Sequence, residues 1–379
     1  MAISWKGHVM SKKAWGWIAA AVVVIGVAIV AFPIRTTESN IVKVGVVLPL
    51  TGAAADQGKD ILSGIELARD EINAHHPDGP GVSLLVEDDQ SMPKGGVSAL
   101  EKIIQTERPP VVIGPVASSV MLAMIPIAER EKVVLLSPAA SSPKISKSGK
   151  YIFRISLLAP PQAEALAQYA RSDLKAHTAA ILYVNDDTGL SYCEAFRGAW
   201  IRIGGALVFE DAYDKTATDF RTHVTKIKVA SPDVTFVPGV PQTIGLIMKQ
   251  AKELGLKTQF LANYGAEGAS LLAIGGNAAE GLVYASIPIS EDFASSFRAR
   301  FGRHPTIGAP LGYDALQIVW EVAREKGLTS EDMRRGLCRL SGFRGATGLT
   351  SMLNSGDAEK DVRLKTVRNG AFVALNPSE

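Results

Sequence analysis

The sequence predicts an α/β protein built from two doubly wound halves, and three observations support this fold class. Short apolar runs of strand length recur along the chain, bounded by Gly, Pro or Ser. Between these runs, apolar residues recur at helical spacing, as at Ile61, Ile65, Ala68 and Ile72. The chain has 379 residues, of which 47% are hydrophobic, and this is enough for two cores of ordinary domain size. Because strands alternate with helices, we expect parallel sheets covered by helices.

The first half contains four expected strands. They lie at Val42–Leu48, Val82–Val86, Val111–Ile113 and Val133–Leu136. Helices are expected around residues 61–72, around residues 97–104 and between the third and fourth strands, because apolar residues recur there every three or four positions.

A second series follows Tyr151–Ser156 and repeats the alternation. Its strands are expected at Ala180–Val184, Ala206–Phe209, Val234–Val237 and near Phe260. Its helices are expected near Cys193–Ile203, at Phe220–Val229 and at Ile244–Leu254. The chain therefore carries two similar α/β halves.

Residues 1–40 differ from the rest of the chain. Lys12 and Lys13 precede an uncharged apolar run, Trp15–Phe32, at the short edge of the length that crosses a membrane. This pattern predicts a signal peptide or a membrane anchor, and the small residues near the end of the run resemble a cleavage site only weakly. Either form implies a periplasmic or extracytoplasmic location.

The charge of the chain argues against a nucleic-acid partner. The formal net charge is +2, and the four basic residues and one acidic residue of positions 1–40 contribute +3, which leaves −1 for residues 41–379. No basic stripe with interleaved aromatic residues remains after position 40.

Two serine-rich segments follow neighbouring strands of the first half. Ser118 and Ser119 follow the strand Val111–Ile113, and Ser137–Ser142 follows the next strand. Small ligands bind outside the carboxyl ends of strands in open parallel sheets, where helix N-termini offer free amides. Each serine alone is explained equally well as a helix cap. Two serine clusters on adjacent strand ends favour a binding site.

Motifs for catalysis, nucleotides and metals are absent or incomplete. Gly52–Asp60 resembles a phosphate-binding loop but has the wrong glycine spacing, and Asp60 stands where Ser or Thr is required. No GxGxxG follows the first strand, and no GxSxG occurs. His75 and His76 have no further ligand at metal-binding spacing, so a solvated turn is the better interpretation. We expect no cofactor and no metal.

One long motif resembles a known family. Gly114–Pro143 reads GPVASSVMLAMIPIAEREKVVLLSPAASSP, which is similar to the core signature of the type I periplasmic binding proteins, in the branched-chain amino-acid-binding branch. Val44–Ala74, the pair Asp88-Asp89, Leu256–Phe260 and Phe343–Gly348 add to the resemblance, which covers about residues 41–375.

The resemblance implies two Rossmann-like lobes joined by a three-strand hinge. The crossings fall near residue 155, at Gly281–Ile287 and near Gly345–Ser351. This assigns residues 41–155 and 287–345 to lobe I, and residues 156–286 and 346–379 to lobe II. Such lobes close over a ligand held between them.

The resemblance also implies positions for the ligand. The carboxylate-binding positions of the family correspond to Ser118, Ser141 and the backbone of Ala139 and Ala140. The acidic residue that meets the ligand ammonium in the amino-acid binders corresponds to Tyr264. Three aromatic positions of the family correspond to Thr188, Val240 and Gln57. The carboxylate end is therefore retained, whereas the ammonium end is changed.

Glu267 is the acidic residue nearest to Tyr264 in this segment. It could replace the family's acidic residue, although the sequence GAEG (Gly265–Gly268) favours a surface turn.

The two cysteines, Cys193 and Cys338, fall in different lobes of this division. A disulfide between them would clamp the hinge, so we expect two unpaired, buried thiols. The disulfide of the amino-acid-binding relatives is absent, since its positions correspond to Ser91 and Ala117.

These observations favour a solute-binding receptor that hands its ligand to the permease of an ABC transporter, without catalysis of its own. A membrane-tethered sensor of the same fold is the alternative, with Trp15–Phe32 as an uncleaved anchor. A nucleotide-dependent oxidoreductase is disfavoured by the missing glycine fingerprint. The expected ligand is an amino acid or a related carboxylate or amide. Because Tyr264 supplies no counter-charge, we expect either a ligand without a free α-ammonium or a further acidic residue that the motifs do not locate.

Overall fold

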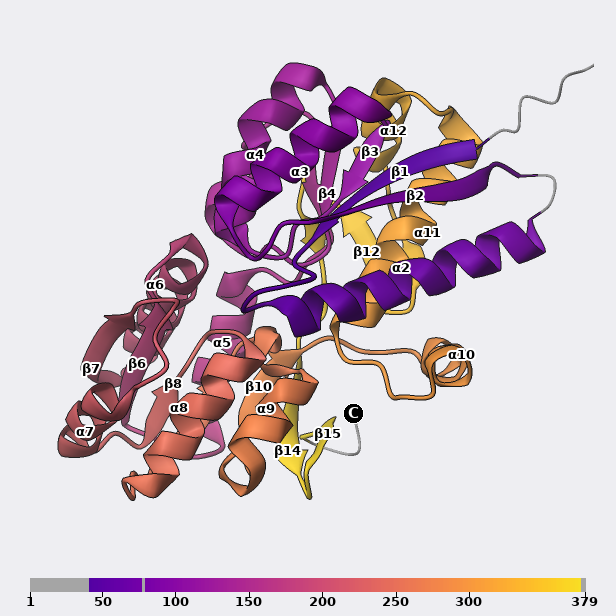
Figure 1. Cartoon of the computed structure of the whole chain (residues 1–379). Helices are drawn as coiled ribbons and strands as arrows, with labels where there is room; N and C mark the ends of the chain where they lie inside the picture. Colours follow the sequence, from indigo (N-terminus) through magenta and orange to yellow (C-terminus); the bar gives the residue numbers. More distant parts are fainter. Residues whose placement is uncertain (1–40, 77–78, 376–379) are drawn as a thin grey trace, which may run out of the picture. The chain divides into compact units, whose positions relative to one another are not determined.

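The computed structural model describes residues 41–76 and 79–375, and it contains two large, mainly parallel sheets with helices on both faces (Figure 1). The first sheet has the order β2-β1-β3-β4-β5, and every neighbouring pair is parallel. Its strands are β1 (Ile41–Leu48), β2 (Gly81–Asp88), β3 (Val111–Ile113), β4 (Val134–Ser137) and β5 (Ile152–Arg154). The helices between them are α2 (Ala55–His75), α3 (Pro93–Thr106) and α4 (Ser118–Glu131). We call this sheet with its helices the first lobe.

Strands of the first lobe are apolar because most of them are buried on both faces. Along β1, Val46 and Leu48 join the core shared with α2, whereas Val47 joins the core shared with α3 and α4. In β4, Leu136 joins the core shared with α2, and Leu135 joins the core shared with α3 and α4. Alternate side chains of a strand point to opposite faces, so a run without polar residues is the sequence of a doubly covered strand.

The second sheet has seven strands in the order β15-β14-β10-β9-β8-β6-β7. Its strands are β6 (Thr178–Val184), β7 (Ala206–Tyr213), β8 (Val234–Phe236), β9 (Gln259–Ala262), β10 (Val283–Ser286), β14 (Arg363–Arg368) and β15 (Ala371–Ala374). Its helices are α5 (Ala159–Ser172), α6 (Asp187–Arg202), α7 (Arg221–Ala230), α8 (Pro241–Glu253) and α9 (Ala269–Gly275). The strands from β7 to β10 are parallel, and β14 and β15 are antiparallel additions. We call this part the second lobe.

The hairpin of β14 and β15 is a feature that the predicted strand–helix alternation did not include. Asn369 and Gly370 connect the strands, and both have positive φ angles, 53° and 68°. Two-residue hairpins favour Asn-Gly because both central residues need φ above zero. The dipeptide was therefore a usable signal.

The chain returns to the first lobe after β10. There it forms α10 (Glu291–Phe301), α11 (Gly308–Lys326), α12 (Ser330–Leu337) and a small antiparallel sheet of β11 (Phe343–Gly345), β12 (Gly348–Met352) and β13 (Ala358–Glu359). Helix α11 packs tightly on α2, because Gly64 lies against the backbone of Ala309: a Cβ at Gly64 would lie 1.8 Å from the Ala309 oxygen.

The position of the last crossing between lobes stays a proposal, and the core contacts refine it. Met352 and Ala358 belong to the core beside the first sheet, and the next strand, β14, pairs in the second sheet. We therefore propose that the last crossing lies between β13 and β14 rather than near Gly345–Ser351.

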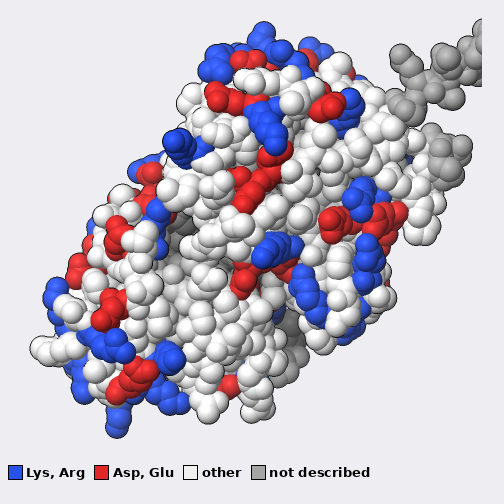
Figure 2. Space-filling model, viewed as in Figure 1, with Lys and Arg blue, Asp and Glu red and all other residues white. Residues whose placement is uncertain are grey.

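The predicted segment at Trp15–Phe32 lies outside the described residues, so the signal-peptide or anchor prediction stays open. Among residues 41–76 and 79–375, no helix combines the length and the hydropathy that a membrane span requires. Basic and acidic side chains lie interspersed on the face that Figure 2 shows.

Candidate ligand-binding site

A cavity of about 110 Å³ lies where the carboxyl ends of the two sheets face each other. Its wall takes residues from the first lobe after β1, β2, β3 and β4, and from the second lobe after β6, β7, β8 and β9. Six of the eight residues that the sequence selected line it. These are Gln57, Ala139, Ser141, Thr188, Val240 and Tyr264.

The other two selected residues, Ser118 and Ala140, lie behind the wall. The Ser118 hydroxyl accepts hydrogen bonds from the backbone amides of Ser141 and Ser142, each at 3.1 Å. The amide of Ala140 donates to the hydroxyl of Ser137 at 2.8 Å. The two serine-rich segments are thus bound to each other, and these amides are already paired.

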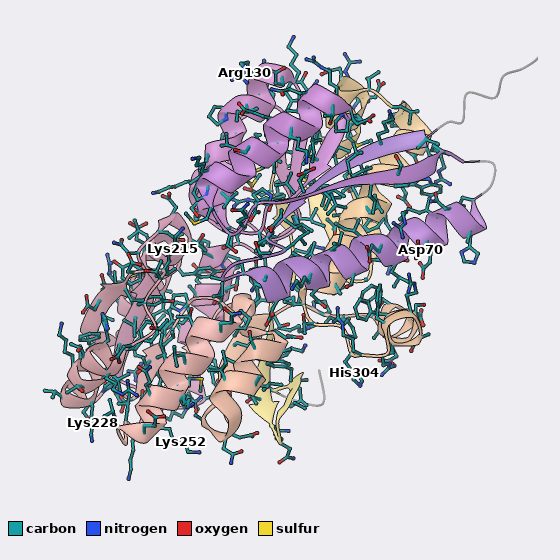
Figure 3. The ribbon with its side chains drawn as sticks, in the orientation of Figure 1. Asp70, Arg130, Lys215, Lys228, Lys252 and His304 are labelled. Atoms are coloured by element: carbon teal, nitrogen blue, oxygen red, sulfur yellow. The ribbon has the colours of Figure 1, made fainter. Side chains whose placement is uncertain are left out.

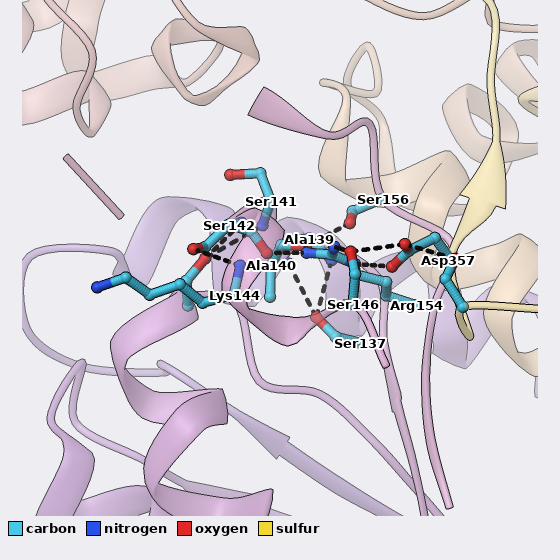
Figure 4. A network of polar contacts seen from close by, with 12 residues as sticks. Ser137, Ala139, Ala140, Ser141, Ser142, Lys144, Ser146, Arg154, Ser156 and Asp357 are labelled. Carbon is cyan, nitrogen blue, oxygen red and sulfur yellow. Dashed lines mark hydrogen bonds and ion pairs between the residues drawn. The ribbon is translucent and has the colours of Figure 1, made fainter. Parts of the chain in front are cut away.

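A buried arginine fixes the segment that follows β4 (Figure 4). Arg154 donates from Nη1 to the carbonyl oxygens of Ala140 and Ser142, at 3.2 and 2.6 Å. Its Nε donates to Asp357 at 2.5 Å, and neither side chain is more than 6% exposed. Because both carbonyl oxygens point at one guanidinium, the residues between them are held at the cavity.

Tyr264 is the central side chain on the second-lobe side of the cavity. Its hydroxyl donates to the carbonyl oxygen of Ala139, and its amide donates to Gln162 Oε1 at 3.0 Å. Gln162 also donates to the hydroxyl of Tyr192 at 2.8 Å. Burial raises the pKa of Tyr192 to about 12 and raises the pKa of Tyr264 well above 10, so both phenols are neutral near pH 7.

Several direct hydrogen bonds join the lobes at the cavity. Gln57 Nε2 donates to the carbonyl oxygen of Gly265 at 2.9 Å, and the Ser118 amide donates to Thr188 Oγ1 at 3.2 Å. Two of the predicted site residues, Gln57 and Thr188, therefore hold the lobes together as well as lining the cavity.

Among the described residues, two charged side chains line the cavity, Asp186 and Lys215. Asp186 caps α6 by accepting from the Gly189 amide at 2.9 Å. Burial raises the pKa of the Asp186 carboxyl, and its backbone hydrogen bonds and the charge of Lys215 oppose that shift. Lys215 lies on the side of the second lobe that faces the first (Figure 3), with Nζ 2.9 Å from the sulfur of Met92.

Comparison with known proteins identifies this architecture. The family model described as periplasmic binding protein matches residues 41–371. The chain belongs to this family. It is 30% identical to a Leu/Ile/Val-binding protein of Rhizobium johnstonii over 300 residues, which is 77% of this chain and 81% of that protein.

Solved structures agree with this result. The leucine-binding protein LivK of Thermotoga maritima superposes with a TM-score of 0.82 at 28% identity, over 89% of this chain and 99% of that one. A solute-binding protein of an ABC transporter from Rhodopseudomonas palustris, in complex with 3,4-dihydroxybenzoic acid, shares the fold. Its TM-score is 0.80 at 23% identity, over 88% of this chain and 96% of that one. The predicted type I periplasmic binding protein fold, with two lobes, is confirmed.

Sequence reasoning missed several polar side chains in the wall of this binding protein. They include Asp186, Tyr192, Tyr213 and Lys215. Asp186 ends the turn after β6 and Tyr213 ends β7, so both occupy the strand ends where ligands bind in such sheets. Tyr192 gave no usable signal, because on α6 it resembles a core residue.

Glu267 requires a correction. The predicted surface turn is wrong, because Glu267 is only 2% exposed. Its carboxylate accepts from Lys365 Nζ at 2.9 and 3.0 Å and from the Tyr284 hydroxyl at 2.9 Å. Strands β10 and β14 supply these partners, and no local pattern around GAEG indicates them. Glu267 does not line the cavity and already has a counter-charge.

The cysteines are partly as predicted. Both are unpaired, and Cys193 is buried, but Cys338 is exposed at the end of α12. Within the described residues, no cluster of His, Cys, Asp and Glu could hold a metal ion.

We expect Ser118→Ala to lower the free energy of unfolding by at least about 2 kcal/mol, because it leaves two buried amides without an acceptor. Urea unfolding measures the change. Ser295→Ala, at an exposed serine of α10, is the control and should cost less than about 0.5 kcal/mol. Equal unfolding midpoints for the two variants would show that Ser118 does not hold the segment after β4.

Proposed function

We propose that this protein is the extracytoplasmic solute-binding component of an ABC importer. It binds a small carboxylate or carboxamide without an α-ammonium group between its lobes, and it delivers this ligand to a membrane permease without chemical change. The family match and the cavity between the strand ends support the general role. The chemistry of the wall supports the choice of ligand.

The observation that carries the ligand proposal is the position of Tyr264. By the family resemblance, Tyr264 is expected to correspond to the acidic residue that meets the ammonium in the amino-acid binders, and a phenol supplies no counter-charge near pH 7. Its hydroxyl also uses the Ala139 carbonyl oxygen as an acceptor. An ammonium group beside Tyr264 would be buried without a partner, which costs several kcal/mol.

The carboxylate end of the cavity keeps hydrogen-bond donors. Ser119 and Ser141 line the wall, and Ser119 stands in the first turn of α4, where a helix N-terminus favours negative charge. Ser118 and Ala140 support this end by fixing its backbone. The same fold accommodates an aromatic carboxylate in the Rhodopseudomonas palustris protein.

An amino acid is the second candidate ligand, because Asp186 is an acidic residue in the wall. Its carboxylate already caps α6, and Lys215 lies near enough to affect its pKa. We therefore rank this candidate second and test Asp186 directly below.

A thermal-shift screen with matched pairs of acids and amino acids tests the proposal. The pairs are 4-methylpentanoate with leucine and 3-phenylpropanoate with phenylalanine, together with benzoate and benzamide. We expect an acid or amide to raise Tm, because saturating ligand stabilises the folded state by several kcal/mol. Chromatography of the same mixtures should recover the ligand unchanged. Stabilisation by the amino acids alone would overturn the ligand proposal.

The cellular form of the protein is tested by mass spectrometry of material from its host. We propose a soluble mature form, with an amino terminus between about Ala28 and Asn40. An intact terminus recovered in the membrane fraction would support the tethered sensor instead.

A further inference from the structure

Two contacts between the lobes lie at opposite ends of the cavity. At one end the Tyr264 hydroxyl bonds to Ala139, which joins the tip of β9 to the tip of β4. At the other end Lys215 Nζ lies 2.9 Å from the sulfur of Met92, which joins the segment after β7 to the segment after β2. In both sheets these strands are three positions apart, about 14 Å between strand axes. A ligand carboxylate at the first end therefore leaves the β2–β7 end for another group.

Tyr213 lies toward the β2–β7 end and has an unpaired hydroxyl. The residue is only 3% exposed, its ring packs edge-on against Phe220 at 5.2 Å, and it lines the cavity. A Cβ on Gly239 would lie 2.9 Å from the Tyr213 oxygen, so only glycine leaves this hydroxyl its space.

The other buried tyrosines of the described residues all have hydroxyl partners. Tyr192 is paired with Gln162, Tyr264 with Ala139 and Tyr284 with Glu267. No described residue forms a hydrogen bond with the Tyr213 hydroxyl. Because Tyr213 lines the cavity, this hydroxyl can form its hydrogen bond with a ligand group.

The charged side chains around the β2–β7 end of the cavity determine which ligand group fits there. Asp186 lies close enough to raise the pKa of Tyr213 further, beyond the larger effect of burial, and Lys215 lies in the same part of the wall. Asp186 would repel a second carboxylate on the ligand, and Lys215 would repel an ammonium. A hydroxyl meets no like charge, and it can donate to Asp186 while it accepts from Tyr213 or Lys215.

We infer that Tyr213, Asp186 and Lys215 form a subsite for a ligand hydroxyl, so that the ligand is a hydroxylated carboxylic acid. This inference rests on the proposed function, because it requires a carboxylate at the serine-rich end.

Calorimetry with the full chain tests the subsite, using acids that differ only by a hydroxyl. The pairs are benzoate with 3- and 4-hydroxybenzoate, and hexanoate with 6-hydroxyhexanoate. We expect at least one hydroxylated acid to bind about tenfold more tightly than its parent, the value of one good hydrogen bond. In Tyr213→Phe this ratio of Kd values should fall to about one. Tyr169→Phe, on α5 and outside the cavity wall, is the matched control and should keep the wild-type ratio.

The inference is wrong if no hydroxylated acid binds more tightly than its parent, whether both bind equally or neither binds. It is also wrong if Tyr213→Phe keeps the ratio while its circular dichroism and Tm match those of the wild type. If acids bind without a preference for the hydroxyl, only the subsite fails. If leucine binds and no acid does, the proposed function fails with it.

Discussion

Asp357→Ala should lower the free energy of unfolding by about 3–5 kcal/mol, because it leaves the fully buried Arg154 guanidinium without its counter-charge. Burial already lowers the pKa of Arg154, and the hydrogen bond and charge of Asp357 oppose this shift. Asp357 also accepts from Ser146 and Ser355, each at 2.7 Å, so their hydroxyls lose an acceptor in the variant.

The same substitution should weaken ligand binding. Arg154 holds the carbonyl oxygens of Ala140 and Ser142, and without Asp357 its guanidinium is free to turn toward other acceptors. Urea unfolding and calorimetry measure the two effects. Glu210→Ala breaks the partly exposed Arg197–Glu210 pair and should cost less than about 1 kcal/mol. Equal losses in the two variants would contradict the role assigned to the buried pair.

Asp89→Asn should remove a large part of the pH dependence of the free energy of unfolding. Asp89 is 1% exposed; its Oδ1 accepts from the Ser91 amide at 2.7 Å, and its Oδ2 has no partner. Burial raises the pKa of this carboxyl from 3.8 to about 7, and the neighbouring Asp88 adds to the shift. The folded protein therefore binds this proton more tightly than the unfolded chain does.

The sign follows from proton linkage. The contribution of Asp89 to stability is fully present below about pH 4 and is lost as the pH rises through 7. Between pH 5 and pH 8, the wild type should lose about 3 kcal/mol relative to Asp89→Asn. Urea unfolding of both proteins across this pH range gives the difference between their free energies of unfolding. The contributions of the other carboxyl groups are the same in both proteins and cancel in this difference. Parallel stability profiles would show that Asp89 is ionised in the folded protein at pH 5.

Much of the fold is predictable from local pattern, because parallel strands buried on both faces are continuous apolar runs. The strands from β1 to β4 were found in this way, with ends that differ by a few residues. The boundaries between lobes are harder to locate, because a crossing leaves no change in composition. Met352 and Ala358 show this, since only their packing assigns them to the first lobe.

For the candidate site as well, features set by local sequence were predictable, and features set by contacts between distant segments were not. The serine-rich segments could be located because they follow two adjacent strands, which share one edge of a sheet. Sequence alone did not reveal that the Ser118 hydroxyl would accept hydrogen bonds from the amides of Ser141 and Ser142, since that pairing depends on how two loops meet. Glu267 was misjudged for a similar reason, because its partner Lys365 lies 98 residues away.

Calorimetry with leucine and 4-methylpentanoate tests the central claim most directly, since the two differ only by the α-ammonium group. We expect the acid to bind at least about 100-fold more tightly than leucine, because an unpaired buried charge costs several kcal/mol. Asp186→Asn should leave this order unchanged. Tighter binding of leucine, lost in Asp186→Asn and kept in Tyr264→Phe, would contradict the claim and identify Asp186 as the partner of an amino-acid ammonium.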